Sequence, residues 1–387
     1  MKMDNNYHNY FSKFAAVGLC LSMLSLSSCG VIEMRDAGEE TERGEADTAM
    51  MLAPAERVNE VEVRTKESEI TIIQEEAPKT VVKFAAAGDV CIDETIIVDA
   101  ANRAAEGSTY SFLKIYSGVY RDIRDADIAV GAYSTAAAPY GCEDQTQTTP
   151  IESLAALAEL GFEVLDTTGA DLSSGYSDDM TEYGVGNIHA AQTGENAVYT
   201  IEQDGITFAF LAADGTGKDT LVRDIEYADS VSDVVVISVN WADGASDKLK
   251  KNLAATLAGA GADIILGSGE TLGGAEWIDT GDGTQTLAVY SLGNFVATAG
   301  EAAENLCGGI LSLDITLCEG VISLENVCVD PILMHYTEEN RNYQIFELKG
   351  YTDDISATHA VEGLDIAAIT DKVSSVLNGF LPADFPS

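Results

Sequence analysis

Residues 81–89 read Val-Val-Lys-Phe-Ala-Ala-Ala-Gly-Asp, an apolar run that ends in a glycine and a carboxylate. Such a run is typical of a strand that is buried within a parallel sheet. Asp89 would then stand at the carboxyl end of that strand. The stretch therefore predicts a first buried strand that delivers an acidic side chain to the edge of a sheet.

Strand-like and helix-like segments alternate after this stretch. A helix is predicted over 149–160, with Thr149 as its N-cap and Gly161 at its end. Further helices are predicted from Ser246 and over 361–377, since apolar residues share one face of each. Strands are expected at 162–165, 234–239, 263–266 and 286–291, and hairpins at 197–212 and 310–329. This order predicts an α/β protein with a mixed sheet or two packed sheets flanked by helices.

Composition excludes several classes of protein. The chain has 387 residues, of which 46% are hydrophobic, so collagen, a coiled coil and wholesale disorder are excluded. The formal net charge is −43, and residues 81–387 alone hold 13 basic and 49 acidic residues. A chain this acidic would repel nucleic-acid phosphates, so no nucleic-acid partner is expected. Only four histidines occur, which restricts imidazole-based chemistry.

The N-terminus has the layout of a secretory signal. Basic residues precede an apolar stretch at 14–26, and Ser27-Ser28-Cys29 follows. This run resembles a bacterial lipobox, which implies a signal peptide over 1–28, lipidation of Cys29 and anchoring of an extracytoplasmic protein to the bacterial membrane. An ordinary signal peptide with an incidental cysteine is the alternative. Residues 29–80 then read as an acidic disordered linker, 81–335 as the main domain and 336–387 as a C-terminal extension with one helix packing on it.

Several motifs resemble those of the CapA capsule-synthesis (poly-γ-glutamate synthesis) family. They are Phe84 to Asp89, Ala126 to Val130, Leu160 to Val164, Gly261 to Gly267 and, above all, Tyr290-Ser-Leu-Gly-Asn-Phe295. The resemblance spans about 81–334. It implies a metallophosphatase-like sandwich of mixed β-sheets flanked by helices, and a role in making, exporting or attaching a surface polymer.

The polar motifs of that family are altered in this chain. Its Asn-Leu-Glu, Ala-Asn-Asn-His, His-Trp-Gly and Gly-His-His-Pro-His motifs are replaced here by residues 131–133, 168–171, 240–242 and 267–271. Every histidine position is lost. A two-metal phosphoesterase centre needs several imidazole and carboxylate ligands around two ions. We therefore expect no metal cofactor, with Asp89 as a remnant of the metal site, and favour binding over catalysis.

Two interpretations remain open for the replaced positions. Asp171, Asn240 and Glu270 are either hydrated loop residues at sheet edges or, with Asp89, members of an all-oxygen site for Mg²⁺ or Ca²⁺. Asp89, Asp171 and Glu270 are also the candidate acid/base residues of a rebuilt hydrolase or transferase site. The candidate binding residues are Asn240, Trp241 and Asn294.

The expected partners follow from the anchor and the charge. A domain this acidic would repel bare poly-γ-glutamate at low ionic strength, so a protein of the polymer-synthesis complex or a cation-bridged polymer is the expected partner. Lys248, Lys250 and Lys251 form the only tight basic cluster, which is either the wet face of a helix or a contact for an anionic polymer. A purely structural envelope protein is a third alternative.

Overall fold

A computed structural model of the chain describes residues 79–135, 149–170, 176–216, 219–241, 245–281, 283–298 and 302–386. The predicted signal peptide, Cys29 and all but the last two residues of the predicted linker lie outside these ranges, as does Asp171. No helix among the described residues is both long and apolar enough to cross a bilayer.

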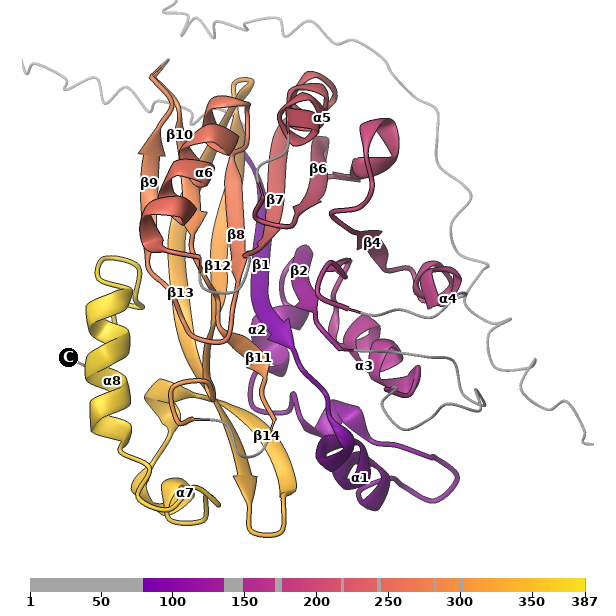
Figure 1. Cartoon of the computed structure of the whole chain (residues 1–387), viewed down its shortest axis with the longest axis vertical. Helices are drawn as coiled ribbons and strands as arrows, with labels where there is room; N and C mark the ends of the chain where they lie inside the picture. The colour runs from indigo at the N-terminus through magenta and orange to yellow at the C-terminus, as the bar shows by residue number, and fades with distance from the viewer. Residues whose placement is uncertain are drawn as a thin grey trace, which may run out of the picture. The chain divides into compact units, whose positions relative to one another are not determined.

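The first sheet is built around β1, Lys79–Val90 (Figure 1). On one side of β1 the strands β2, β3 and β4 follow in parallel, and on the other side β12, β13 and β14 follow in antiparallel. β11 pairs in parallel with the end of β1. The bounds are Ile128–Tyr133 (β2), Val164–Asp166 (β3), Gly186–Ile188 (β4), Asn294–Val296 (β11), Cys307–Cys318 (β12), Val321–Thr337 (β13) and Arg341–Glu347 (β14).

The second sheet has six strands in the order β5-β6-β7-β8-β10-β9. Its four central strands are parallel, and β5 and β9 pair in antiparallel at the two edges. The bounds are Tyr199–Gln203 (β5), Ile206–Ala213 (β6), Val234–Asn240 (β7), Ile264–Ser268 (β8), Ala275–Asp279 (β9) and Gln285–Val289 (β10).

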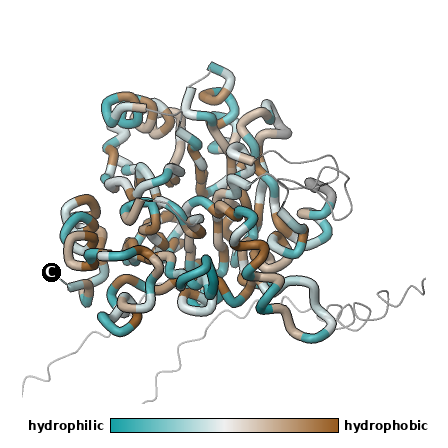
Figure 2. The backbone as a smooth tube through the Cα atoms, turned by 60° about the horizontal axis from the view of Figure 1, so that its bottom comes forward, coloured by the Kyte–Doolittle hydropathy of each residue, from teal (hydrophilic) through white to brown (hydrophobic). Residues whose placement is uncertain are grey.

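Two hydrophobic layers hold these sheets and their helices together. One cluster joins side chains of β1 and β2 with side chains of β6, β7, β8 and β10, so it lies between the sheets. A second cluster lies between the other face of the second sheet and helices α5 and α6. Hydrophobic segments accordingly run through the interior of the molecule (Figure 2). The helices are Glu94–Asn102 (α1), Tyr120–Arg124 (α2), Glu152–Leu160 (α3), Tyr176–Glu182 (α4), Asp219–Val231 (α5), Asp247–Gly259 (α6), Asp353–Ser356 (α7) and Ile366–Val376 (α8).

The predicted α/β architecture is therefore confirmed, as two mixed sheets flanked by helices, which is consistent with a metallophosphatase-like sandwich. Both predicted hairpins form. Their turns place Asp204-Gly205 and Glu319-Gly320 at positive φ, as a two-residue hairpin turn requires.

One helix start was predicted wrongly. α3 begins at Glu152 instead of after Thr149, and its N-cap residue Ile151 makes no side-chain cap bond. The Thr149 hydroxyl lies 3.5 Å from the Ile92 carbonyl oxygen, which it contacts in place of a helix N–H. Gly161 does end the helix, at φ 118°, as expected.

Acidic residues start four of the parallel strands in the same way. Asp127, Glu163, Asp233 and Asp263 stand directly before β2, β3, β7 and β8. The main-chain N–H of each acidic residue donates to the carbonyl of one residue on the neighbouring strand. The N–H of that strand residue donates back to the carboxylate of the acidic residue, at 2.6–2.8 Å. The carboxylate thus accepts the N–H that the next strand would otherwise have to bind with a main-chain carbonyl. Because each acidic residue bonds to one particular residue of its neighbour, these pairs fix the register of the parallel strands in both sheets.

The C-terminal residues extend the first sheet. The expected boundary at residue 335 lies inside β13, which continues to Thr337 and pairs with β14. α8 packs Ile369 and Val373 into the core.

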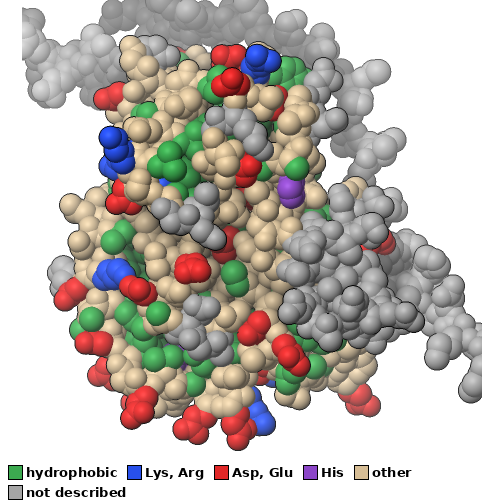
Figure 3. All heavy atoms as spheres, in the orientation of Figure 1, with side chains coloured by type: hydrophobic (Ala, Val, Ile, Leu, Met, Phe, Trp, Pro, Cys, Tyr) green, Lys and Arg blue, Asp and Glu red, His purple; other side chains and the backbone are tan. Residues whose placement is uncertain are grey.

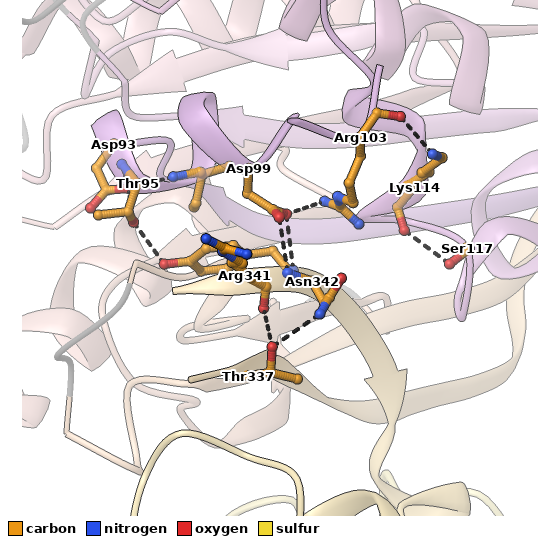
Figure 4. Close-up of polar contacts among 11 residues, drawn as sticks. Asp93, Thr95, Asp99, Arg103, Lys114, Ser117, Thr337, Arg341 and Asn342 are labelled. Atoms are coloured by element: carbon orange, nitrogen blue, oxygen red, sulfur yellow. Dashed lines mark hydrogen bonds and ion pairs between the residues drawn. The ribbon is translucent and has the colours of Figure 1, made fainter. Parts of the chain in front are cut away.

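A buried ion pair fastens β14 to the N-terminal part of the domain (Figure 4). The Asp99 carboxylate of α1 lies 2.6 Å from the Arg103 guanidinium and accepts the backbone N–H groups of Asn342 and Tyr343 at 2.9 and 3.1 Å. The hydroxyls of Thr95 and Tyr343 are 2.7 Å apart. The first helix and the last strand are therefore held by bonds to charged groups, which are stronger than neutral ones.

Gly88 carries a testable requirement of this fold. A Cβ on Gly88 would lie 1.9 Å from the carbonyl oxygen of Gly293, which accepts the Asp89 N–H at 3.0 Å. We expect Gly88→Ala to lower the free energy of unfolding by about 3 kcal/mol or more, because two backbones must separate. Urea unfolding of the purified chain measures this.

Gly259→Ala is the matched control. Nothing lies within 4 Å of a Cβ at Gly259, the last residue of α6. Alanine there should leave stability unchanged or raise it by up to about 1 kcal/mol. Equal effects of the two substitutions would show that the contact at Gly88 does not constrain the fold.

Candidate functional site

Asp89 lies where the sequence predicted, at the carboxyl end of β1, and it is 7% exposed. Both of its carboxylate oxygens accept hydrogen bonds from the protein. The Ser134 hydroxyl, just after β2, donates to Oδ1 at 2.8 Å, and the Gly269 N–H, just after β8, donates to Oδ2 at 3.1 Å. Asp89 therefore links the first sheet to the second.

Asp166 makes an equivalent link at the end of β3. It is 2% exposed, and its Oδ1 accepts the Thr168 N–H at 2.8 Å. Its Oδ2 accepts the Ser238 hydroxyl of β7, in the second sheet, at 2.6 Å. Asp89, Ser134, Asp166, Ser238 and Gly269 together form what we call the carboxylate junction.

The two carboxylates influence each other electrostatically. Burial raises the pKa of Asp89 to about 6, and the negative charge of Asp166 contributes to the rise, while the bonds from Ser134 and Gly269 oppose the shift. Burial also raises the pKa of Asp166, against the bonds from Ser238 and Thr168. The junction therefore favours protonated carboxyl groups closer to neutral pH than is usual for aspartate.

Asn240 and Gly169 complete one side of the junction. A Cβ on Gly169 would lie 2.8 Å from the Asn240 Nδ2 and 2.8 Å from the Ser134 Oγ. The glycine at position 169 thus lets the loop after β3 pass between these two side chains without displacing either of them. Asn240, at the end of β7, is half-buried.

Asn294 and Glu270 lie on the other side. Asn294 pairs with Asp89 in the β1–β11 register, and its Nδ2 donates to the main-chain oxygens of Glu270 and Asn305 at 3.3 and 2.9 Å. The Glu270 carboxylate is exposed and accepts from the Asn305 Nδ2 at 3.5 Å. The Asn294 side chain thus ties together the loops that contain Glu270 and Asn305. It contacts the backbone of Glu270 and not the Glu270 carboxylate.

Trp241 is buried directly after Asn240. Its indole N–H donates to the Tyr290 carbonyl at 2.7 Å, and the Lys250 ammonium lies 5.7 Å from its ring centroid. The residue is 8% exposed, so its ring offers little open surface to a ligand. Asp171 lies outside the described residues.

Sequence reasoning missed three members of the junction. Asp166 had a usable signal, because Val164-Leu165-Asp166 repeats the pattern of an apolar strand that ends in a carboxylate, as in residues 81–89. Ser134 and Ser238 had none, since serines at strand ends are common. Their role follows only from the way the two sheets meet.

The described side chains do not fit the metal centre that the fold resemblance implies. All four carboxylate oxygens of Asp89 and Asp166 accept hydrogen bonds from protein groups. No group of three or more His, Cys, Asp or Glu side chains within the described ranges is arranged to hold an ion. His189, the histidine that follows β4, accepts the Ala191 N–H on its Nδ1 at 2.9 Å. We therefore derive no step through a metal.

Residues 173–299 match the family model described as bacterial capsule synthesis protein PGA_cap. The resemblance to the capsule-synthesis family is confirmed. The matched region contains Asn240, Glu270 and Asn294, and it excludes Asp89 and Asp166. The match indicates a function related to the synthesis of capsule or polyglutamate.

Other comparisons are more distant. No curated protein matches the chain. A hypothetical protein from Thermus thermophilus is similar with a TM-score of 0.41 and 14% identity, over 64% of this chain and 97% of that one. Wild-type Vps29 complexed with Zn²⁺ from Entamoeba histolytica has a TM-score of 0.21 and 13% identity, over 51% of this chain and 96% of that one.

The raised pKa of Asp89 predicts a pH dependence of stability. Below pH ~3 the carboxyl group is largely protonated in the folded and unfolded states alike. As the pH rises toward 6 the unfolded chain loses this proton first, so the folded state is progressively disfavoured. Relative to wild type, Asp89→Asn should therefore gain about 3 kcal/mol of unfolding free energy between pH ~3 and pH ~7.

Urea unfolding at a series of pH values measures this difference. Ser134→Ala is the second variant, because it removes a hydrogen bond that favours the charged carboxylate and should move the transition to higher pH. A stability difference between wild type and Asp89→Asn that stays constant over this range would contradict the prediction.

Proposed function

We propose that this protein is a cell-surface lipoprotein that acts in the synthesis, export or attachment of capsule, poly-γ-glutamate or another surface polymer, and that it acts by binding. The family match supports the connection with the polymer. The state of Asp89 and Asp166 supports binding over metal-dependent catalysis, since their oxygens are engaged by protein donors that connect the two sheets. A metal ion would have to displace these bonds.

Charge restricts the partner. Acidic side chains are spread widely over the face in Figure 3, where basic ones are few. A long polyanion would be repelled by this surface at low ionic strength. The partners we propose are therefore the membrane, through the lipid anchor, and either a protein of the polymer-synthesis machinery or a surface polymer whose charge is screened or bridged by cations.

A binding experiment without metal tests this function. We expect the purified protein to bind one member of a panel of capsular polysaccharide, poly-γ-glutamate and peptidoglycan fragments. A neutral polymer should bind with equal affinity in EDTA and in millimolar Mg²⁺ or Ca²⁺, whereas a polyanion should bind more tightly with the cations, which screen or bridge its charge. Isothermal titration calorimetry measures both polymer and ion binding. Asp89→Asn should retain polymer binding, since the amide keeps an acceptor for the Ser134 hydroxyl.

Two results would contradict the proposal. Stoichiometric ion binding that Asp89→Asn abolishes would show a rebuilt metal site. Absence of binding to every polymer would contradict polymer binding, and absence of binding to the proteins of the polymer-synthesis machinery as well would favour a purely structural envelope protein.

A hydrolase or transferase is the second candidate, and the electrostatics of the junction favour it. Asp89 has a pKa of about 6 next to a second buried carboxyl group, so it could exchange a proton near neutral pH. Phosphoesterase and glycosidase assays distinguish this candidate. Turnover by wild type that Asp89→Ala removes, while the variant still folds, would replace binding by catalysis as the proposed function.

The lipid anchor makes a separate prediction. In cells that process bacterial lipoproteins, Cys29→Ala should release the protein from the membrane fraction, because the acylated thiol is its proposed anchor. Fractionation followed by immunoblotting measures this. Cys91→Ala, which alters a cysteine inside the folded domain, is the control and should stay with the membrane. Equal membrane retention of both variants would contradict lipidation at Cys29.

A further inference from the structure

A pocket lies beside the carboxylate junction, on the side of the second sheet that α6 covers. Its cavity measures about 220 Å³ and is lined by Asp247, Lys250 and Lys251 of α6, the backbone of 273–275, Glu276 and Tyr290. This volume is below the usual range for a drug-sized ligand, so it suits one small polar unit. Trp241 connects the pocket to Asn240, because its indole N–H binds the Tyr290 carbonyl.

One wall of the pocket is held by a chain of polar contacts. The Lys251 ammonium lies 2.8 Å from the Glu276 Oε2, and the Tyr290 hydroxyl donates to Oε1 of the same carboxylate at 2.6 Å. The Lys251 ammonium also lies 5.7 Å from the Tyr290 ring centroid. Both oxygens of Glu276 are thus satisfied, and its ion pair with Lys251 positions the Lys251 ammonium at the pocket, so Asp247 is the lining acid that is left to accept hydrogen bonds.

Lys250 is the second lysine that lines the pocket. Its ammonium lies 5.7 Å from the Trp241 ring centroid, and no carboxylate of the described residues is within ion-pair distance of it. Contact with an aromatic face orients an ammonium but satisfies none of its hydrogen bonds. In a chain with a net charge of −43, two adjacent ammonium groups at a pocket are an unusual feature.

We propose that this pocket binds a single acidic sugar unit, a uronate, of a surface polysaccharide, with its carboxylate at Lys250 and Lys251. The inference rests on the proposed polymer-binding function and names the chemical class of the polymer. Lys250 donates hydrogen bonds to the sugar carboxylate, and the half-buried site strengthens them relative to open solvent.

The remaining lining favours a sugar over an amino-acid unit. Asp247 is an acceptor at the pocket, and the backbone of 273–275 has no side chain larger than a methyl group, so a ring can approach closely. Hydroxyl groups can donate to Asp247, whereas a γ-glutamyl unit, which carries one carboxylate as a uronate does, offers only its amide N–H as a donor. A uronate combines one carboxylate with several hydroxyl donors, which matches this lining.

The test uses the full chain and a tetrasaccharide that alternates glucuronate and glucose. We expect calorimetric binding that falls about tenfold or more with Lys250→Gln, the loss expected for one charge-assisted hydrogen bond. Lys248→Gln is the matched control, because it removes an equal charge from the same helix outside the pocket and should leave affinity unchanged. The carboxyl-reduced tetrasaccharide should bind at least tenfold more weakly than the acidic one.

Several outcomes would overturn the inference. Equal losses for Lys250→Gln and Lys248→Gln would show diffuse electrostatic attraction, and equal affinity for the reduced sugar would exclude a carboxylate contact. Tighter binding of an oligo-γ-glutamate would assign the pocket to a peptide polymer. If another polymer binds but Lys250→Gln has no effect, the inference fails while the proposed function stands. If no polymer binds, the inference fails together with polymer binding as the proposed function, and only a protein partner is left.

Discussion

The need to satisfy two buried carboxylates governs how the two sheets of this protein meet. Asp89 and Asp166 stand at the ends of parallel strands of the first sheet, and each accepts a hydrogen bond from the second sheet. A buried carboxylate without donors or counter-charge would cost several kcal/mol. The ends of β7 and β8 must therefore lie against the ends of β1 and β3, and that contact fixes how the two sheets pack together.

Several glycines follow from the same close approach. Gly88 lies against the backbone of Gly293, Gly169 passes between Ser134 and Asn240, and a Cβ on Gly267 would lie 2.2 Å from the Tyr290 carbonyl oxygen. Each lies at or just after the carboxyl end of a strand, where loops of the two sheets are crowded together. The crowding leaves space for backbone and for small polar side chains. This crowding is consistent with the position of the pocket that contains Lys250, which is lined by α6 and does not include the junction residues.

Much of the fold could be predicted because its signals are local. Apolar runs located the strands, and Asp204-Gly205 and Glu319-Gly320 located both hairpins. The start of α3 was misplaced because a tertiary contact, between Thr149 and Ile92, competes with the local capping pattern. The acidic residues that precede the parallel strands, such as Asp263, can be found in the sequence. Their hydrogen bonds to the neighbouring strand cannot be predicted locally, because they depend on which residues of the two strands lie opposite each other.

The candidate site was harder to predict because its chemistry arises between distant segments. Asp89 was identified as the end of a strand, yet its partners Ser134 and Gly269 are 45 and 180 residues away in the sequence. Trp241 and Asn294 are candidate binding residues from the sequence, and the structure adds that each donates to a main-chain carbonyl of a distant segment. The sequence shows which polar groups are present. Only the packing of the two sheets shows which of these groups are already engaged in hydrogen bonds within the protein.

The scarcity of histidine in this chain and the two carboxylates at the strand ends have a common physical consequence. The carboxylates of Asp89 and Asp166 repel each other unless a cation, a proton or hydrogen-bond donors compensate the charge. Ser134, Ser238 and the Gly269 N–H provide donors here, and because the pKa of Asp89 is raised to about 6, a proton can neutralise part of the remaining charge. The same groups that would face a metal can in this way become part of the scaffold. A ligand must then be recognised by side chains that the junction does not use, and Lys250 and Lys251 lie in the neighbouring pocket where such recognition is available.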